Sequence, residues 1–337
     1  MNKKSEILRE NVGVDISKDD FKAALSYLTS DLEVKIKASR SFSNTLKGIE
    51  EFEKWVVSKQ QLSSCLSFTM EATGVYYESL AYYLFEKKYP VHVILPNLSK
   101  KYAQSLGIKS KTDKIDAALL GRLGLQRKLR PWEPFSVNLR NLKRLTRERD
   151  MYILDRSELK NQLHAFNTQA DPSPHSIKRI KGLIEHFTLQ IKEIESEIKG
   201  IITSDIELSD RLEYLLSIPG IGLLTAVIIV AETNGFASIE NLKQLTSYAG
   251  LDIRIAQSGK WKGKSRISKK GNSHLRKCLY FPAFCKITHD KRTAEYYERL
   301  KARKSKSMIA VVAVQRKLLA LCYTLWKKQE MYDPNIK

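Results

Sequence analysis

The first forty residues contain three short apolar runs that alternate with polar positions and are separated by polar turns. Alternation with a period of two is typical of half-buried β-strands, and short turns between such runs favour antiparallel pairing. We therefore predict a three-strand antiparallel meander over Val12–Ile16, Phe21–Tyr27 and Val34–Ala38.

Helical spacing replaces this alternation after the third run. The pattern predicts a helix over Asn44–Val57 with Asn44 as its N-cap, a strand at Leu66–Met70, a helix over Val75–Lys88 and a strand at Val91–Leu95. A strand–helix–strand unit implies parallel pairing through a right-handed crossover. A meander that leads into such a unit describes an α/β domain with a ribonuclease-H-like sheet and helices on its faces.

The middle of the chain shows no convincing strand pattern. Leu139–Phe166 is helical and strongly charged, and a proline-containing break at 171–174 separates it from a second helical stretch. In that second stretch, apolar residues step by three and four at Ile184, Phe187, Ile191, Ile194, Ile198 and Ile201. Such a seam predicts an all-α helical hairpin or coiled-coil arm, and an ordinary bundle helix is the alternative.

The last third of the chain opens with a helix, the turn Pro219-Gly220-Ile221-Gly222 and a second helix over Leu223–Glu232. This order is typical of a helix-hairpin-helix, whose glycines let backbone amides approach a phosphate, whereas a tight turn between core helices is the alternative. We expect Pro219, Gly220 and Gly222 to contact a nucleic-acid backbone. The final helix, Met308–Trp326, is apolar on most faces and is expected to be core.

These patterns predict three domains. They are an α/β domain over 1–135, a helical arm over 136–208, and a mainly α domain with the helix-hairpin-helix over 209–337.

The net charge of the chain predicts the kind of partner that it binds. The 337 residues include 58 Lys and Arg against 37 Asp and Glu, a formal net charge of +21. A field of that sign attracts polyanions, of which nucleic acid is the usual one. The rival interpretation, a membrane-surface protein, has no support: we find no signal-like N-terminus, no lipidation motif and no apolar run of about 18 residues. A soluble, cytoplasmic protein is expected.

Positive charge is concentrated between Leu251 and Lys306. This segment has 17 Lys and Arg against four Asp and Glu, and aromatic residues are interleaved with the charges, among them Trp261, Tyr280, Phe281, Tyr296 and Tyr297. Basic groups beside aromatic rings are typical of surfaces that contact a nucleic-acid strand, whereas a merely solvated face would carry more balancing acids. The residues expected to bind nucleic acid here are Lys260, Lys262, Lys264, Arg266, Lys269, Lys270, Arg276 and Lys277.

The cysteines do not indicate a metal site. None of Cys65, Cys278, Cys285 and Cys322 forms a C-x-x-C pair. His274 and Cys278, and likewise Cys285 and His289, are four residues apart, but the segment between the pairs is too short for two helices to fold back on each other. We interpret the cysteines as reduced, mostly buried thiols.

Four acidic residues stand out by position. Asp15 ends the first predicted strand, and Glu71 directly follows the fourth. The first and fourth strands of a ribonuclease-H-like sheet are neighbours, which would bring these carboxylates together. Asp113 and Asp116 lie at i and i+3 of a helix predicted to start near Thr112, so both project from one face.

Ionised carboxylates cannot gather without cations. Mg²⁺ takes hard oxygen ligands, and paired ions can clamp a phosphoryl group. In a chain of net charge +21, we therefore interpret Asp15, Glu71, Asp113 and Asp116 as a site for Mg²⁺ or Mn²⁺ rather than as unrelated surface acids.

The motifs around these acids resemble a known domain. Val12–Lys18, Met70–Tyr76 and Lys111–Ala117 are similar to the RuvC-like DEDD domain of the IS-one-ten family of insertion-sequence transposases, a domain shared by the Piv and MooV DNA invertases. Further motifs are similar to that family's C-terminal transposase domain, at Ser217–Gly222, Leu245–Leu251 and Gln257–Asn272. A proline often follows the Ala-Gly-Leu stretch in the family, whereas Ile253 occupies that region here.

The resemblance implies an RNA-guided DNA recombinase. Members join target and donor DNA sites chosen by a structured noncoding bridge or seeker RNA, and they assemble as tetramers, dimers of dimers, across two duplexes. It further implies a composite active site in which the four acidic residues are joined by a catalytic serine, here Ser258. From the residues alone, a Ser-Gly pair in a basic stretch is usually a loop, and Ser265, Ser268 and Ser273 are competitors.

Three functions follow as hypotheses. The leading one is a transposase in which metal-assisted attack by Ser258 forms a phosphoserine link to DNA, through a 5′ or a 3′ phosphate. A RuvC-like nuclease or junction resolvase would need the four acids but no serine. A binding protein with a degenerate site would bind without cleaving. Transposition and site-specific inversion use the same domain pair.

Overall fold

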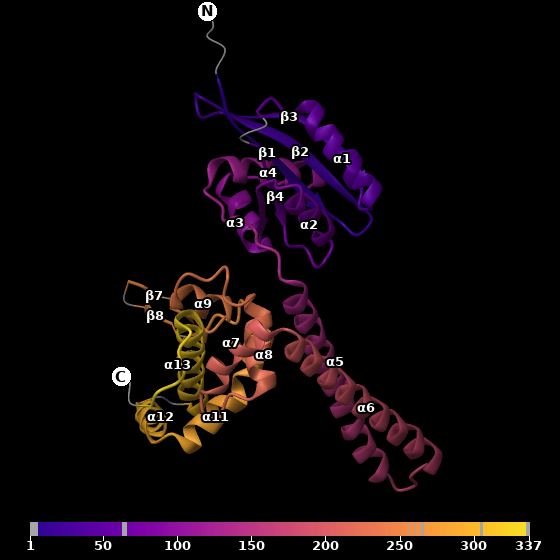
Figure 1. The fold of residues 1–337 in the computed structure, drawn as a ribbon, viewed down its shortest axis with the longest axis vertical. Coiled ribbons are helices and arrows are strands. Elements are labelled where there is room, and N and C mark those ends of the chain that lie inside the picture. The colour runs from indigo at the N-terminus through magenta and orange to yellow at the C-terminus, as the bar shows by residue number, and fades with distance from the viewer. Residues whose placement is uncertain are drawn as a thin grey trace, which may run out of the picture. The chain divides into compact units, whose positions relative to one another are not determined.

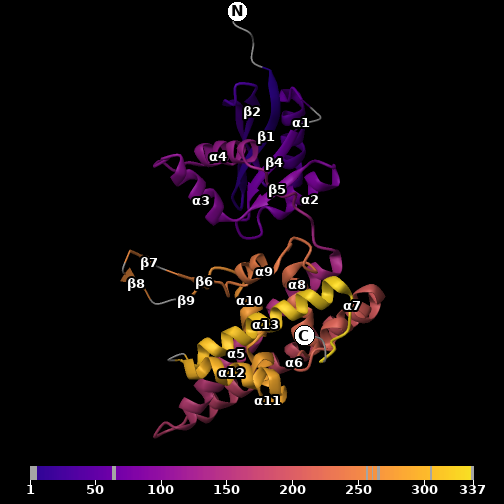
Figure 2. The same cartoon turned by 90° about the vertical axis from the view of Figure 1, so that its left-hand side faces the viewer.

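The computed structural model describes residues 6–62, 66–255, 257–259, 261–263, 266–303 and 306–334. The chain divides into two compact units, 1–134 and 135–337, each with its own core (Figures 1 and 2). The further division of the second unit into an arm and a C-terminal domain stays a prediction. Cys65, Lys260, Lys264 and Ser265 lie outside the described residues.

The first unit is built on a five-stranded mixed sheet of order β3-β2-β1-β4-β5. The first three strands pair antiparallel, and β4 joins β1 and β5 in parallel, which confirms the predicted meander and crossover. Each strand falls where the alternation predicts it. The strands are β1 (Ile7–Ile16), β2 (Asp20–Thr29), β3 (Val34–Ser43), β4 (Leu66–Glu71) and β5 (Val91–Ile94).

Helices cover both faces of this sheet, α1 and α2 on one face and α3 and α4 on the other. Large apolar side chains of β1, β2 and β4 pack with α1 and α2 in one core, while α3 and α4 share a smaller cluster. The helices are α1 (Leu46–Lys59), α2 (Glu78–Glu86), α3 (Pro96–Ser105) and α4 (Asp113–Gln126).

Two predicted helix boundaries are wrong. The N-cap of α1 is Thr45, whose hydroxyl accepts the Gly48 amide, whereas Asn44 donates its side-chain amide to two backbone carbonyls. Helix α2 starts at Glu78 rather than at Val75. Gly74 has a left-handed φ of 57° and opens a turn first, which delays the helix.

Close backbone contact fixes α4 on β1. Val12, Val14 and Ile16 point into the α1–α2 core, so the alternate positions of β1 face α4. A Cβ added to Gly13 would lie 2.0 Å from the carbonyl oxygen of Ala117 and 2.1 Å from the amide nitrogen of Gly121. Only a glycine fits beneath this helix.

Gly13→Ala should therefore displace α4 or unfold the first unit. The added methyl meets backbone atoms that cannot rotate away, so we expect a loss of at least about 2 kcal/mol in the free energy of unfolding. Denaturant titration followed by circular dichroism measures it. Gly182→Ala is the control, because a Cβ there meets nothing within 4 Å. Equal stability of the two variants would contradict the close-packed docking of α4.

The second unit begins with an antiparallel helical hairpin of α5 (Val137–Asn167) and α6 (Pro174–Ser204), as predicted (Figure 1). The seam of α6 packs against its own chain rather than remaining open for a partner. Tyr152 and Phe187 have ring centroids 5.5 Å apart, and Arg149 donates to Glu195 at 2.6 Å. The buried seam ends at Ile202, whereas Ile201 is only partly buried.

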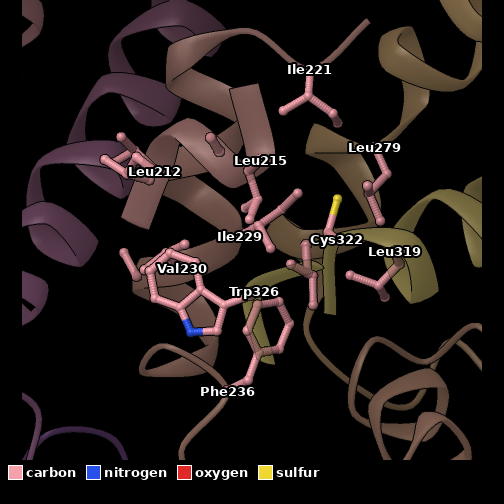
Figure 3. Close-up of a cluster of buried hydrophobic side chains, with 14 of the residues drawn as sticks. Leu212, Leu215, Ile221, Ile229, Val230, Phe236, Leu279, Leu319, Cys322 and Trp326 are labelled. Carbon is pink, nitrogen blue, oxygen red and sulfur yellow. The ribbon is translucent and has the colours of Figure 1, made fainter. Parts of the chain in front are cut away.

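The remaining helices enclose a large apolar core, in which Leu215, Ile229, Phe236 and Trp326 meet (Figure 3), and a smaller cluster lies between α11 and α13. Four two-residue strands interrupt an otherwise mainly helical region. The elements are α7 (Ile206–Leu216), α8 (Leu223–Thr233), α9 (Leu242–Tyr248), β6 (Ile253–Arg254), β7 (Gln257–Ser258), β8 (Trp261–Lys262), β9 (Arg266–Ile267), α10 (Ser273–Cys278), α11 (Tyr280–His289), α12 (Lys291–Arg303) and α13 (Ser307–Lys328).

Helix α13 corrects one sequence expectation. It is long and apolar enough to cross a membrane by length and composition, although no such run was expected. The structure accounts for this hydropathy by packing, because Val314, Leu318, Cys322 and Trp326 are buried in the second unit. The prediction that this helix is core is confirmed.

Candidate metal centre and serine ribbon

Asp15 and Glu71 lie at the same end of neighbouring strands. β1 and β4 run in parallel with Val14 opposite Met70, so Asp15 and Glu71 are the next positions along each strand. Because Val14 and Met70 belong to the α1–α2 core, the alternation of side chains points Asp15 and Glu71 toward the opposite face. That is the face which α4 covers.

Asp113 and Asp116 reach this corner from α4. Thr112 caps the helix by accepting the amide of Ile115, which places both aspartates in the first turn. The contact between α4 and β1 then brings that turn over the end of β1. The structure thus brings together the four acidic residues that the sequence singled out.

The carboxylates of this corner influence one another's pKa. Burial, followed by the charges of Asp116, Asp113 and Glu71, raises the pKa of Asp15 to about 6, and Lys111 opposes this. Burial also raises the pKa of Asp116, again against Lys111 and with the help of Glu71 and Asp113. Ionisation of Asp15 and of Asp116 is therefore opposed by their surroundings.

Hydroxyl groups orient Glu71. One carboxylate oxygen accepts from the buried Ser99 of α3, and the other accepts from Thr73 at 3.3 Å. Sequence reasoning missed Ser99, because nothing in the pattern of α3 relates it to a strand end 28 residues away.

The four side chains offer the oxygen donors that a hard divalent cation prefers. In this structure, however, they are not grouped closely enough to coordinate one. Among the described residues, no three His, Cys, Asp or Glu side chains are grouped tightly enough to hold a metal ion. The donor set consists of carboxylate oxygens, which Mg²⁺ and Mn²⁺ prefer. Burial, followed by the charges of Asp116, Asp113 and Glu71, raises the pKa of Asp15, and a cation beside these carboxylates would offset their repulsion. That Asp15, Glu71, Asp113 and Asp116 bind such an ion stays a prediction.

Asp15→Asn should stabilise the metal-free protein at neutral pH. The folded-state pKa of Asp15 lies above its unfolded value, so the stability of the wild type falls as pH rises from about 4 to 6. Removing the charge should raise the free energy of unfolding at pH 7 by on the order of 1–2 kcal/mol after solvent screening.

Denaturant titration in EDTA at pH 4 and pH 7 measures this gain, with the exposed Asp19→Asn as the control. Mg²⁺ should then stabilise the wild type more than Asp15→Asn. A variant that is less stable than the wild type in EDTA at pH 7 would show that Asp15 is not destabilised by its surroundings.

Ser258 is exposed and lies in the second unit, in a region of two short antiparallel strand pairs, β6 with β9 and β7 with β8. We call these two pairs the serine ribbon. β7 and β8 pair antiparallel with Ser258 opposite Trp261, and Gly259 supplies the left-handed turn with φ 55°. β6 and β9 form a second antiparallel pair. Ser258 thus lies in a short strand rather than in a plain loop, and its role as nucleophile stays a prediction. Among the described residues of the second unit, its hydroxyl has no hydrogen-bond partner.

A buried carboxylate anchors the segments that flank the ribbon. The side chain of Glu232 is 0% exposed and accepts two hydrogen bonds from Arg147, at 2.7 and 2.8 Å, and one from Asn272 at 2.7 Å. Burial opposes ionisation, but the hydrogen bonds from Arg147 and Asn272 prevail and lower the pKa of Glu232. The Tyr248 hydroxyl donates to the backbone carbonyl of Glu232. Sequence reasoning missed this network.

Arg147→Ala should destabilise the segments on either side of the ribbon, at Tyr248 and Asn272. It leaves the buried Glu232 carboxylate without its cation, which should cost about 3 kcal/mol in the free energy of unfolding. Hydrogen exchange at 248–272, together with denaturant titration, measures the loss. Lys301→Ala is the control, since its pair with Glu298 is exposed and should contribute under about 0.5 kcal/mol. Similar losses for both variants would exclude an anchoring role for Glu232.

The residues expected to bind nucleic acid differ in their exposure to solvent. Pro219 and Gly222 are exposed and Gly220 is half-buried, while the exposed group on the ribbon and after it comprises Arg266, Lys269 and Lys270. The side chain of Lys262 lies outside the described part of the structure.

Two further residues of that set have partners within the chain. One nitrogen of the Arg276 guanidinium donates to the carbonyls of Ala249, Gly271 and Asn272, and Lys277 pairs with Asp150 at 3.3 Å. Arg276 therefore serves the fold of this segment.

The cysteines differ in exposure. Cys322 is buried and Cys278 is half-buried, whereas Cys285 is exposed, contrary to expectation. Burial raises the pKa of the Cys322 thiol to about 12, which makes this group unreactive at neutral pH. His274 lies 3.4 Å from Asp150.

Comparison with known proteins gives the class. Residues 12–172 match the DEDD transposase family model, and residues 212–298 match the model described as transposase IS116/IS110/IS902 family. The two matches cover the acidic cluster and the serine ribbon. The fold and the matched segments define a transposase, an enzyme that acts on DNA.

Full-length relatives name the family more closely. The chain is 30% identical over 329 residues to the pilin gene-inverting protein of Moraxella lacunata, covering 96% of this chain and 98% of that one. It is 24% identical over 242 residues to the transposase for insertion sequence element IS1328 of Yersinia enterocolitica, covering 64% and 69%. The chain belongs to the IS110 (IS-one-ten) family of transposases.

A structural match adds nothing to this assignment. A Ppx/GppA family protein from Aquifex aeolicus aligns over 94% of this chain and 90% of that one, with 11% identity and a TM-score of 0.23.

Proposed function

We propose that this protein is an RNA-guided DNA recombinase that cuts and rejoins two DNA sites with Ser258 as nucleophile and Asp15, Glu71, Asp113 and Asp116 as ligands of Mg²⁺ or Mn²⁺. The convergence of the four acids on one corner of the sheet is the observation that carries this proposal. Such a cluster is destabilising in a metal-free protein, so its presence in a chain of net charge +21 argues for metal-dependent phosphodiester chemistry.

The reaction is a phosphoryl transfer in which each step breaks one phosphate ester bond and forms another. The hydroxyl oxygen of Ser258 attacks a backbone phosphorus of one strand, its proton leaves, and the bond to a DNA oxygen breaks with protonation of that oxygen. A phosphoserine ester remains, through either a 5′ or a 3′ phosphate. Attack by a hydroxyl of the second DNA site then restores a phosphodiester and frees Ser258. The metal would supply Lewis-acid stabilisation of the phosphoryl charge.

Activation of Ser258 requires groups from outside its ribbon. A serine hydroxyl is a weak nucleophile without an adjacent base, and the described residues around Ser258 supply none. We therefore propose a composite site, in which the acidic cluster of the first unit meets Ser258 only in an assembled complex. An isolated protomer should be nearly inactive although it carries all four acids.

The partners in the proposal are target and donor DNA, a structured guide RNA, and three further copies of the chain arranged as a dimer of dimers in the cytoplasm. The high positive charge supports polyanionic partners, and the resemblance to the IS110 family supports RNA guidance and the tetramer. Site-specific inversion is an equally well-supported outcome of this chemistry, because the pilin gene-inverting relatives match over almost their whole length.

Ser258→Ala should abolish strand exchange while nucleic-acid binding persists. The loss should exceed a thousandfold, because the substitution removes the attacking atom itself. Joining of labelled target and donor duplexes in Mg²⁺ measures it, and mass spectrometry of the quenched reaction should locate DNA on the peptide containing Ser258. Ser273→Ala, an exposed serine of the same segment, is the control and should retain activity.

A metal-dependent nuclease with water as nucleophile is the alternative, since the acidic cluster lies within one unit. It predicts that Ser258→Ala still cleaves DNA and that no protein–DNA adduct forms. Normal recombination by Ser258→Ala would overturn the serine assignment.

A further inference from the structure

Helix α11 exposes two phenylalanines on one face. The side chain of Phe281 is 77% exposed and that of Phe284 is 37% exposed. Residues three apart on a helix are neighbours on its surface, so the two rings lie on the same side of α11. A phenylalanine this exposed adds nothing to the core.

Tyr280 supports both phenylalanine rings. The Tyr280 ring makes edge-on contacts with both phenylalanines, with ring centroids 5.5 Å from Phe281 and 5.0 Å from Phe284. Tyr280 in turn packs against the buried cluster of Ala283, Val311 and Val314. The three rings therefore form an aromatic platform, held from below by α11 and α13, whose outer surface is open.

The segment that contains the aromatic platform is rich in positive charge. Residues 251–306 include 17 Lys and Arg against four Asp and Glu. Lys291 and Arg292 are exposed just after α11, and the guanidinium of Arg292 also donates to the backbone carbonyl of Pro334 at 2.6 Å. Asp290, the acid nearest to them in sequence, is already paired with Lys286 at 3.1 Å and accepts from Thr293 at 2.8 Å. This charge is complementary to a polyanion.

The turn of the helix-hairpin-helix adjoins this helix. A Cβ on Gly220 would lie 3.3 Å from the Cβ of Cys285 and 3.3 Å from the carbonyl oxygen of Pro282. Cys285 lies one helical turn beyond Phe281 on the same side of α11. The turn at Gly220 thus packs against the same helix that carries the aromatic platform.

We propose that Phe281 and Phe284 form a stacking site for unpaired bases of a single DNA strand. A flat π-face stacks on any base that is not paired, which suits sequence-tolerant contact, and neighbouring cations hold the phosphates. A duplex presents no free base faces to the platform. The inference rests on the proposed function, because an enzyme that exchanges strands must hold unpaired DNA while the cut ends move.

The test is binding, measured apart from chemistry in a full-length Ser258→Ala background. Fluorescence anisotropy with labelled single-stranded and duplex DNA of equal length, at one salt concentration, compares Phe281→Ala/Phe284→Ala with the parent. Single-strand affinity should fall roughly tenfold, and duplex affinity should stay within about twofold. Leu189→Ala, an exposed apolar residue of the arm, is the matched control.

A second variant keeps the aromatic surface. Phe281→Trp should bind single-stranded DNA as the parent does, and the fluorescence of the new indole should be quenched when a base stacks on it. Unchanged single-strand affinity of the alanine variant, equal losses for single strand and duplex, or loss confined to single-stranded RNA would overturn the proposal. A change in oligomeric state on alanine substitution would assign the platform to a second copy of the chain instead. Failure of Ser258 to form an adduct would leave these binding results untouched.

Discussion

The close approach of α4 to β1 is the constraint on which the acidic site depends. Because Gly13 has no side chain, the helix lies directly on the strand, with Ala117 and Gly121 above it. A larger residue at that point would lift the helix away from the sheet. The first turn of α4 carries Asp113 and Asp116, so the same contact sets their distance from Asp15. The packing of α4 on β1 therefore also positions the acidic cluster that we propose as a metal site.

The polar lining under α4 extends this contact. Asn11 donates to Ser67 and Thr69 at 2.7 and 3.0 Å, and a Cβ on Gly124 would lie 2.3 Å from the Thr69 hydroxyl. The opposite face of the sheet carries large apolar side chains and packs in the ordinary way. The two faces of the sheet thus have different roles. The apolar face stabilises the first unit, and the polar face holds α4 close enough for Asp113 and Asp116 to join Asp15 and Glu71. Burial is the largest cause of the raised pKa of Asp15, and the charges of Asp116, Asp113 and Glu71 add to it.

Much of this arrangement is predictable from sequence because it depends on short-range periodicity. Alternation located the strands, and the position of Glu71 directly after an apolar strand indicated its place at the sheet edge. The i, i+3 spacing of Asp113 and Asp116 indicated one helix face, and the Thr112 cap confirmed where that helix begins. The error at Asn44 shows the limit of such rules, since Asn44 and Thr45 are both good caps and the choice depends on the carbonyls that Asn44 reaches.

Features that depend on distant partners could not be predicted. Arg147 and Asn272 meet Glu232 from 85 and 40 residues away, and no local pattern relates them. Gly13 and Gly121 are ordinary glycines until the helix is placed on the sheet. The exposure of Phe281 likewise follows from which face of α11 packs on α13, a choice that its sequence of mixed apolar residues leaves open. The family resemblance identified Ser258, but not the strand in which it lies.

The central proposal, that four acids from three separate segments together bind Mg²⁺ or Mn²⁺, can be tested most directly by metal-directed cleavage. Fe²⁺ substituted for Mg²⁺ in the full-length protein, with ascorbate and peroxide, cuts the backbone close to the bound ion. The account predicts cuts in all three segments, near residues 15, 71 and 113–116, which excess Mg²⁺ suppresses together. Cuts confined to one segment, or cuts elsewhere in the chain, would contradict it.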